Sequence, residues 1–400
     1  MVRQSARRQR LLVALVAFVI SAGATIMAAD SSPSAAKPEN APKPSASASA
    51  PGGDKLRIGI AYGDTLTWAK DDELAIGLDD AVNSGSQWVR VDLSWRNIQP
   101  ESSKRYEWQR FDRVVTAARA RGLTVLPVIG YTPRWAQKVS CPGNDQSCPP
   151  ANPETFAAFA AEAVKRYAPQ GVHTWEIWNE PNIPFWAPKP DPVGYTELLK
   201  ATTKSMRKAD PQAFLVMGGL AAVGTDAKKG YISQSEFLAE ICKLGANRLV
   251  DAVGYHPYTY PYLPSAKTDF GTAFEDISSA RGNLVAVLDA NGTPNLPIWL
   301  TETGAPTNGP GTAADGKTIP PDSTHVTPAF QAEIATDTIP AAAANPHVGA
   351  VFWFADQDSG TEKDKGQRSK FYGLRSFDGT PKPALDAWKA AVGAYQKRKP

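Results

Sequence analysis

Two glutamates in this 400-residue chain each stand at the end of a short apolar stretch, and this placement suits acid–base chemistry. Glu180 lies in WEIWNEPN at 175–182, and Glu302 lies in PIWLTETG at 297–304. Alternating apolar residues predict a strand in each stretch, and the proline after Glu180 ends the first one because it has no N–H to donate. An apolar wall disfavours the charged form of a carboxyl group, which suits a general acid. Glycoside hydrolysis uses such a pair, one carboxyl as acid/base and the other as nucleophile or base.

Eight short apolar segments alternate with helical patterns, and they are the elements that position these side chains. Strands are expected at 56–62, 88–94, 124–130, 173–179, 214–220, 250–256, 297–303 and 350–354. Strands separated by helices indicate a parallel sheet, and eight of them favour an α/β fold, a single (β/α)8 TIM barrel. The alternative is an open doubly wound sheet, which would be expected to carry a G-x-G-x-x-G loop, and the sequence has none. In a barrel, catalytic side chains lie at C-terminal strand ends, where both glutamates fall.

The two motifs together resemble the clan A retaining glycoside hydrolases, whose catalytic glutamates follow strands four and seven of a TIM barrel. WNEP with a late WLTETG is most similar to family 39 and its bacterial relatives, and next to family 5. The resemblance runs from about residue 56 to about residue 388. It implies that Glu180 is the general acid/base, that Glu302 is the nucleophile, and that Asn179 contacts the sugar 2-hydroxyl and the nucleophile. The alternative for either glutamate is a surface or salt-bridged role.

The resemblance also implies supporting roles for side chains on three further strands. His256 and Tyr258 match a His-x-Tyr pair after strand six, in which the tyrosine bonds to the nucleophile. Arg90, in the second strand, matches an arginine that pairs with the nucleophile, and an ion pair with Asp92 is the alternative. Trp353, in the eighth strand, matches the tryptophan that forms the floor under the reacting sugar.

Other aromatic side chains near strand ends could serve the same site, because sugar C–H faces stack on rings. Tyr255 or Tyr260 could replace Tyr258. Four more residues are candidates for sugar platforms, with plain packing as the alternative for each: Trp95, Tyr131, Trp135 and Trp186.

Cysteines and the N-terminal segment indicate an exported protein. Cys141 and Cys148 enclose a short Pro/Gly/Asn loop, which predicts a local disulfide; metal binding would need two further ligands, and no ligand motif stands nearby. Residues 1–29 place four arginines before an uncharged apolar run at 11–29, which predicts a signal peptide or an N-terminal anchor that tethers the chain to a membrane. Residues 30–54 are Ala/Pro/Ser-rich, which predicts a disordered linker before a catalytic domain at 55–400.

Composition narrows the partners and the reaction class. The net charge is +3 with acids and bases interspersed, which argues against a nucleic-acid surface. The four histidines form no metal-ligand pattern, so neither a metal nor another cofactor is expected. We therefore expect a secreted or extracytoplasmic monomer that cleaves β-linked bonds in an extracellular or cell-wall polysaccharide or oligosaccharide. Two alternatives stay open: a transglycosylase on the same site, and a non-catalytic carbohydrate-binding barrel, which would be expected to lack one of the glutamates.

Overall fold

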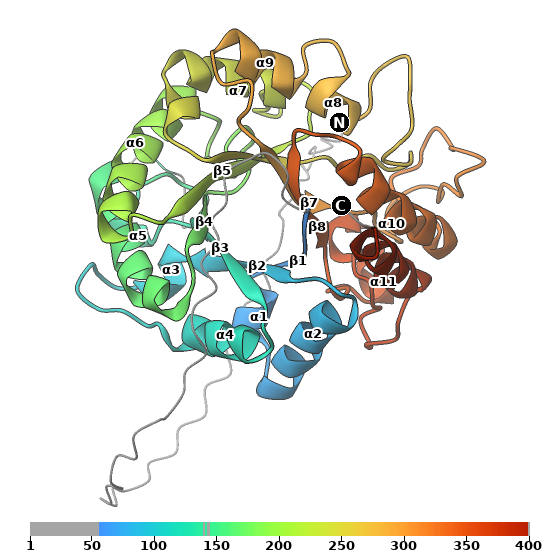
Figure 1. The fold of residues 1–400 in the computed structure, drawn as a ribbon, viewed down its shortest axis with the longest axis horizontal. Helices are drawn as coiled ribbons and strands as arrows, with labels where there is room; N and C mark the ends of the chain where they lie inside the picture. Colours follow the sequence, from blue (N-terminus) through green and yellow to red (C-terminus); the bar gives the residue numbers. More distant parts are fainter. Residues whose placement is uncertain (1–55, 139–140, 142–144, 399–400) are drawn as a thin grey trace, which may run out of the picture. The chain divides into compact units, whose positions relative to one another are not determined.

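Eight parallel strands close into a barrel in the computed structural model, which describes residues 56–138, 141 and 145–398 (Figure 1). The strands follow one another around the barrel in chain order, and β1 completes the ring by pairing with both β2 and β8. Their bounds are β1 Arg57–Gly63, β2 Trp88–Ser94, β3 Thr124–Gly130, β4 Thr174–Ile177, β5 Phe214–Ala221, β6 Ala252–His256, β7 Ile298–Thr303 and β8 Val348–Phe354. The predicted α/β class and (β/α)8 barrel are confirmed.

Helices surround the barrel as an outer ring (Figure 1). They are α1 Thr65–Trp68, α2 Asp71–Asn83, α3 Trp95–Ile98, α4 Gln109–Ala120, α5 Pro153–Tyr167, α6 Pro192–Ala209, α7 Gln234–Lys243, α8 Glu275–Ser278, α9 Leu284–Ala290, α10 Pro328–Ala343 and α11 Pro383–Gln396. Short 3-10 turns are η1 Arg134–Ala136, η2 Ala168–Gln170, η3 Ala246–Arg248, η4 Glu362–Asp364 and η5 Arg368–Lys370. The start of α5 follows from its sequence, because Asn152 caps the helix by accepting from the Glu154 N–H at 2.9 Å and a proline follows.

Side chains alternate between the barrel interior and the helix layer along each strand, as the pleat requires. On β8, Ala350 and Phe352 belong to the small cluster inside the barrel, together with Trp299 of β7. Val351 and Trp353 belong to the larger core between the sheet and the helices. Residue parity on β8 therefore decides whether a side chain faces the barrel interior or the helix layer.

The first and last strands meet at a seam that the C-terminal helix covers. Arg57 of β1 is in register with Ala350 of β8. The Leu56 N–H donates to the Tyr395 hydroxyl of α11 at 2.7 Å, and α11 lies beside α10. The Leu56 end of the barrel and the helix α11 are therefore held together.

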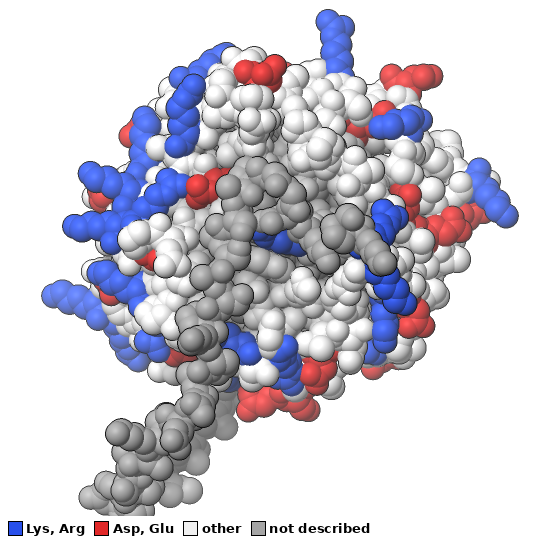
Figure 2. All heavy atoms as spheres, viewed as in Figure 1, with Lys and Arg blue, Asp and Glu red and all other residues white. Residues whose placement is uncertain are grey.

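Predictions for the N-terminus lie outside the described residues. The signal peptide or anchor at 1–29 and the linker at 30–54 fall before residue 56, so the proposed segment boundaries stay predictions. Within residues 56–138, 141 and 145–398, none of the helices combines the length and the apolar character needed to cross a membrane. Acidic and basic side chains are interspersed around the rim of the face in Figure 2, in keeping with the near-neutral net charge.

The predicted disulfide between Cys141 and Cys148 is present, with their Cα atoms 6.1 Å apart. It lies in the loop between β3 and α5, and this loop is joined to the loop after β4 because the Ala187 N–H donates to the Ser147 carbonyl at 2.9 Å. Cys242 is a free, buried thiol in α7, and burial raises its pKa to about 11.

Removing this disulfide with Cys141→Ser and Cys148→Ser together should lower the free energy of unfolding by about 2 kcal/mol, the low end of the usual range, because the loop that it closes is short. Urea denaturation of the oxidised protein and the double variant measures the difference. Equal midpoints for the two proteins under oxidising conditions would contradict the expectation, and the fully reduced wild type serves as the matched control.

Candidate active site

A buried arginine lies at the centre of the site. Arg90 projects from β2 into the barrel and is 1% exposed, so its charge needs partners. Its Nε and Nη2 donate to the two carboxylate oxygens of Glu176 at 2.6 and 3.1 Å. Its Nη1 donates to Glu302 Oε1 at 2.6 Å, and Nη2 also donates to Asn179 Oδ1 at 2.8 Å. The alternative partner, Asp92, instead accepts a hydrogen bond from a tyrosine.

Glu302 lies near the C-terminal end of β7, and both of its carboxylate oxygens accept hydrogen bonds. Oε1 accepts from Arg90, and Oε2 accepts from the Tyr258 hydroxyl at 2.6 Å. His256 Nδ1 lies 3.7 Å from Oε2. Burial raises the pKa of Glu302, but the positive charges of His256 and Arg90 and the bond from Tyr258 outweigh burial and lower the pKa below its usual value. Glu302 is therefore held as an ionised carboxylate.

Glu180 reaches the mouth of the barrel on a tight turn. The strand β4 ends at Ile177, two residues before the predicted end at 179. Trp178 and Glu180 then take left-handed φ angles of 73° and 45°, which non-glycine residues rarely adopt. The turn is held because the Glu180 N–H donates to the Gly219 carbonyl of β5 at 2.9 Å. Such strained positions cluster at functional sites, where the surrounding structure holds them.

His256 joins the two glutamates. Its ring is fully buried at the end of β6, and its Nδ1 lies 2.9 Å from Glu180 Oε1. Burial lowers the pKa of His256, but the charge of Glu302 and the contact with Glu180 outweigh burial and raise it above the usual value. Gly219 makes room for the ring, since a Cβ there would lie 2.0 Å from Nε2. The neighbours of His256 therefore favour the protonated form of its ring.

The two glutamates are close enough to act on one bond. One oxygen from each lies within 4.8 Å of the other and of the His256 ring nitrogen. Retaining pairs stand about 5–5.5 Å apart, and inverting pairs about 6.5–9.5 Å apart to admit a water. By distance alone, this trio could hold a metal ion, but Glu302 is already ion-paired with Arg90, and the other two groups bond to each other. The donor set therefore fits proton transfer better than metal binding.

Two of the predicted sugar platforms are packing residues. Trp95 is fully buried and stacks on Phe159 with ring centroids 5.6 Å apart. Trp186 is 3% exposed and packs against Trp178 at 5.0 Å. Neither placement fits a sugar platform, so the alternative reading holds for both residues.

Two other predicted platforms keep exposed surface in the segment after β3. The Tyr131 hydroxyl donates to Asp92 Oδ2 at 2.8 Å, and the Trp135 indole donates to the Gln99 carbonyl at 2.8 Å. Both rings are thus held in one orientation next to the strand end. Their contact with a sugar stays a prediction.

Trp353 does not form the floor of the site, because its parity on β8 directs it outward. Its ring packs on Trp388 of α11 with centroids 5.7 Å apart. The next residue, Phe354, packs against the cluster inside the barrel and is partly exposed, and its ring lies 5.7 Å from that of Tyr372. Phe354 and Tyr372 therefore form the aromatic surface beside Tyr258, whose ring is 5.2 Å from Tyr372.

Sequence reasoning missed three residues of this site besides Phe354. Glu176 carried a usable signal, because a charged residue within a buried strand must have a partner. Thr301, which contacts both Glu176 and His256, stands one residue before Glu302 without a pattern of its own. Tyr372 follows a polar loop, where nothing in the sequence distinguishes it from other loop aromatics.

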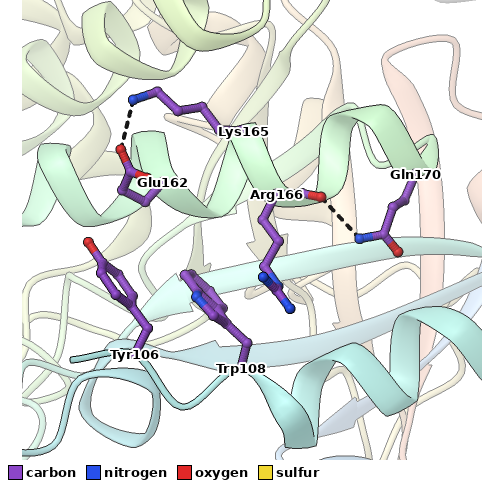
Figure 3. A pocket seen from close by; sticks show the side chains of 6 residues that line it. All are labelled: Tyr106, Trp108, Glu162, Lys165, Arg166 and Gln170. Atoms are coloured by element: carbon purple, nitrogen blue, oxygen red, sulfur yellow. Dashed lines mark hydrogen bonds and ion pairs between the residues drawn. The ribbon is translucent and has the colours of Figure 1, made fainter. Parts of the chain in front are cut away.

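A hollow of about 470 Å³ is lined by side chains of α5, η2 and the segment before α4, and neither Glu180 nor Glu302 is among them (Figure 3). It is lined by Tyr106, Trp108, Glu162, Lys165, Arg166 and Gln170. Several of its polar groups already have partners, since Lys165 donates to Glu162 at 2.7 Å, Gln170 donates to the Arg166 carbonyl at 3.0 Å, and the Arg166 Nε donates to Asp112 at 2.8 Å. No polar group there is directed at a ligand in the way that the barrel site directs its two carboxylates.

Known proteins resemble this chain in sequence and in fold. The sequence model of the family described as Cellulase (glycosyl hydrolase family 5) matches residues 54–354. A beta-xylosidase from Geobacillus stearothermophilus is 25% identical over 229 residues, which is 51% of this chain and 42% of that protein. The match thus spans less than half the length of this curated relative.

Solved structures share the fold. A family 39 glycoside hydrolase from Bacteroides cellulosilyticus WH2 aligns with a TM-score of 0.65 and 22% identity, over 86% of this chain and 64% of that one. The GH5_18 structure from Streptomyces cattleya, in complex with GlcNAc, aligns with a TM-score of 0.60 and 19% identity, over 88% of this chain and 82% of that one. At these identities, the likeness shows a common barrel.

The buried carboxyl group of Asp92 should make the stability of the protein depend on pH. It is 9% exposed, and burial raises its pKa to about 7 although Arg90 lowers it. The folded protein binds this proton more tightly than the unfolded chain, in which the pKa is about 3.9, so this residue's contribution to stability falls as the pH rises from about 4 through 7. Asp92→Asn should therefore unfold like wild type near pH 4 and be more stable by roughly 1–4 kcal/mol at pH 8.

Thermal and urea unfolding at both pH values measures this difference. Asp269→Asn, a substitution at an exposed aspartate, is the matched control and should change stability little at either pH. A variant that is destabilised equally at pH 4 and pH 8 would contradict the expectation.

Proposed function

The chain belongs to glycosyl hydrolase family 5, the cellulase family, and from this premise we propose that it hydrolyses β-linked glycosidic bonds with retention of configuration. The predicted membership of the clan A glycoside hydrolases is confirmed by the match. The matching model is that of family 5, which the sequence motifs resembled next after family 39. Family 39, which the sequence placed first, is represented among the solved structures with the same fold. The substrate class that we propose is a polysaccharide or oligosaccharide.

The close approach of the two carboxyl groups is the observation that carries this proposal. One oxygen of Glu180 and one of Glu302 lie within 4.8 Å, which leaves too little room for a water to attack from the opposite face. Glu302, kept ionised by its neighbours, attacks the anomeric carbon while Glu180 gives its proton to the departing glycosidic oxygen. A covalent glycosyl-enzyme forms and the C–O bond to the leaving group breaks.

The second half of the reaction reverses these roles. Glu180, now a carboxylate, takes a proton from water as the water oxygen attacks the anomeric carbon. The bond to Glu302 breaks, the sugar leaves with its original configuration, and both glutamates return to their starting states. Each turnover thus consumes one water and returns one proton to Glu180.

Neighbouring groups support recognition of the reacting sugar in this proposal. Asn179 presents its Oδ1 to Arg90, which leaves its NH2 group to donate to a sugar 2-hydroxyl. Phe354 takes the place of Trp353 as the aromatic floor, next to Tyr258 and Tyr372. Arg90 itself acts through Glu302 and does not need to touch the substrate.

The proposal includes the location of the enzyme. Residues 1–29 would direct the chain out of the cytoplasm, either as a cleaved signal peptide or as a membrane tether, and residues 30–54 would link that segment to the catalytic domain at 55–400. The substrate would then be an extracellular or cell-wall glycan, met by a monomer without a cofactor.

Replacing each glutamate should separate the two roles. Glu302→Gln should abolish turnover and leave sugar binding largely intact. Glu180→Ala should slow β-glycosides with poor leaving groups by about 10²–10⁴-fold, and should slow activated aryl β-glycosides far less because a good leaving group scarcely needs the acid. Added azide should partly restore Glu180→Ala and yield a β-glycosyl azide. Kinetics on a panel of aryl and alkyl β-glycosides measure these effects.

The anomer formed first decides the stereochemistry. Proton NMR during turnover should show the β-anomer appearing before mutarotation. An α-anomer formed first would overturn the retaining mechanism, and oligosaccharide products in place of free sugar would identify a transglycosylase. Glu240→Gln, at an exposed position of α7, is the matched control and should react like wild type.

A further inference from the structure

A buried carboxylate lies behind the two catalytic glutamates and acts only as a hydrogen-bond acceptor. Glu176 is fully buried, and its Oε1 accepts from the Gly219 N–H at 2.9 Å and from Thr301 Oγ1 at 3.1 Å. Both of its oxygens also accept from Arg90. Its position deep in the barrel leaves it no contact with a substrate, so any effect on the reaction must pass through its neighbours.

Thr301 links Glu176 to His256 through its hydroxyl group. The single hydroxyl proton of Thr301 is donated to Glu176, so the hydroxyl oxygen has only lone pairs to offer in other directions. His256 Nε2 lies 3.1 Å from that oxygen. The contact is a hydrogen bond only if Nε2 carries the proton and donates it. All three side chains are fully buried, so water cannot substitute for a missing donor.

We propose that Glu176 and Thr301 hold His256 with Nε2 protonated, so that its Nδ1 shares one proton with Glu180. This inference rests on the proposed function, in which Glu180 is the general acid. The proton between Nδ1 and Glu180 Oε1, 2.9 Å apart, belongs either to a carboxylic acid facing a neutral ring or to a protonated ring facing a carboxylate. In both forms, the pair delivers that proton to the leaving group.

The other neutral tautomer would disable the acid. With hydrogen on Nδ1 and none on Nε2, the ring would donate to Glu180 Oε1 and stabilise the ionised carboxylate, which is the form that has no proton to give to the leaving group. Thr301 and Glu176 are thus positioning residues that exclude this tautomer. The other charged or titratable groups that face the ring are Glu302 at 3.7 Å, Tyr258 with ring centroids 6.5 Å away, and Arg90 through its charge.

The shared proton also explains how one pair serves both steps. After the proton leaves with the first product, neutral Nδ1 and ionised Oε1 face each other without a hydrogen between them. Two facing acceptors repel, and a proton taken from the incoming water relieves that repulsion. The bond from Thr301 keeps Nε2 protonated throughout, so the proton that returns goes to the Nδ1–Glu180 side.

Substitutions at Thr301 test the inference in the full chain. Thr301→Val keeps the shape and removes the hydroxyl, and it should lower kcat/KM for alkyl β-glycosides by at least about 10-fold while changing 2,4-dinitrophenyl β-glycosides by less than about 3-fold. Thr301→Ser keeps the hydroxyl and should restore the wild-type ratio between the two substrates. Thr338→Val, which removes another buried hydroxyl in α10, is the matched control and should leave that ratio unchanged.

The tautomer itself can be observed by NMR of the protein labelled with ¹⁵N-histidine. The His256 signals, assigned with a His256→Asn variant, should show a protonated Nε2 in the wild type and in Thr301→Ser across the pH range of activity. A bare Nε2 in the wild type, or an equal loss of both substrates in Thr301→Val, would overturn the inference. A wild type that hydrolyses no glycoside would instead overturn the proposed function, because the NMR result does not depend on turnover.

Discussion

The burial of one guanidinium is the constraint on which the rest of the site depends. Arg90 carries its charge inside the barrel, where an unpaired ion is costly, and three side chains from β4, the turn after it and β7 satisfy it. Removing one partner of a buried ion pair typically costs about 3–5 kcal/mol. Glu176 and Glu302 therefore contribute to the stability of the fold as well as to the site, and Asn179 adds a hydrogen bond to the same guanidinium. Glu302 in turn orients Tyr258 by accepting a 2.6 Å hydrogen bond from its hydroxyl.

Two glycines of β5 make this crowded arrangement possible. A Cβ at Gly218 would lie 2.6 Å from the Trp178 carbonyl, and a Cβ at Gly219 would lie 2.0 Å from the His256 ring. With no side chains there, the left-handed turn after β4 packs directly on the β5 backbone. The backbone of β5 then serves the site itself, since the Gly219 N–H bonds to Glu176 and its carbonyl accepts from the Glu180 N–H. The absence of a side chain at Gly219 thus lets its backbone N–H and carbonyl groups bond to the two glutamates.

The periodicity of the sequence predicted the barrel and the strand ends that carry Glu180 and Glu302, because both follow from local patterns. Periodicity did not identify Glu176 as a second partner of Arg90 beside Glu302, since Glu176 lies 86 residues away from Arg90 and only the arrangement of the strands brings the two together. Trp353 shows a different limit: the side chain that faces the mouth is set by strand parity, which places Phe354 there and directs Trp353 at α11. The position of the Glu180 side chain depends on the left-handed φ angles of Trp178 and of Glu180 itself, which no local sequence pattern predicted.

The seam between β1 and β8 joins the strand that is made first to the strand that is made last. The strand β1 leaves the ribosome first, but Arg57 cannot pair with Ala350 until the last strand has been made. Until then, β1 keeps one edge with unpaired N–H and C=O groups, which is the kind of edge that recruits other chains. A chain stalled before β8 thus has an open sheet in place of a ring. A chain that lacks β8 would therefore be more prone to pair with other chains than one that lacks a surface loop.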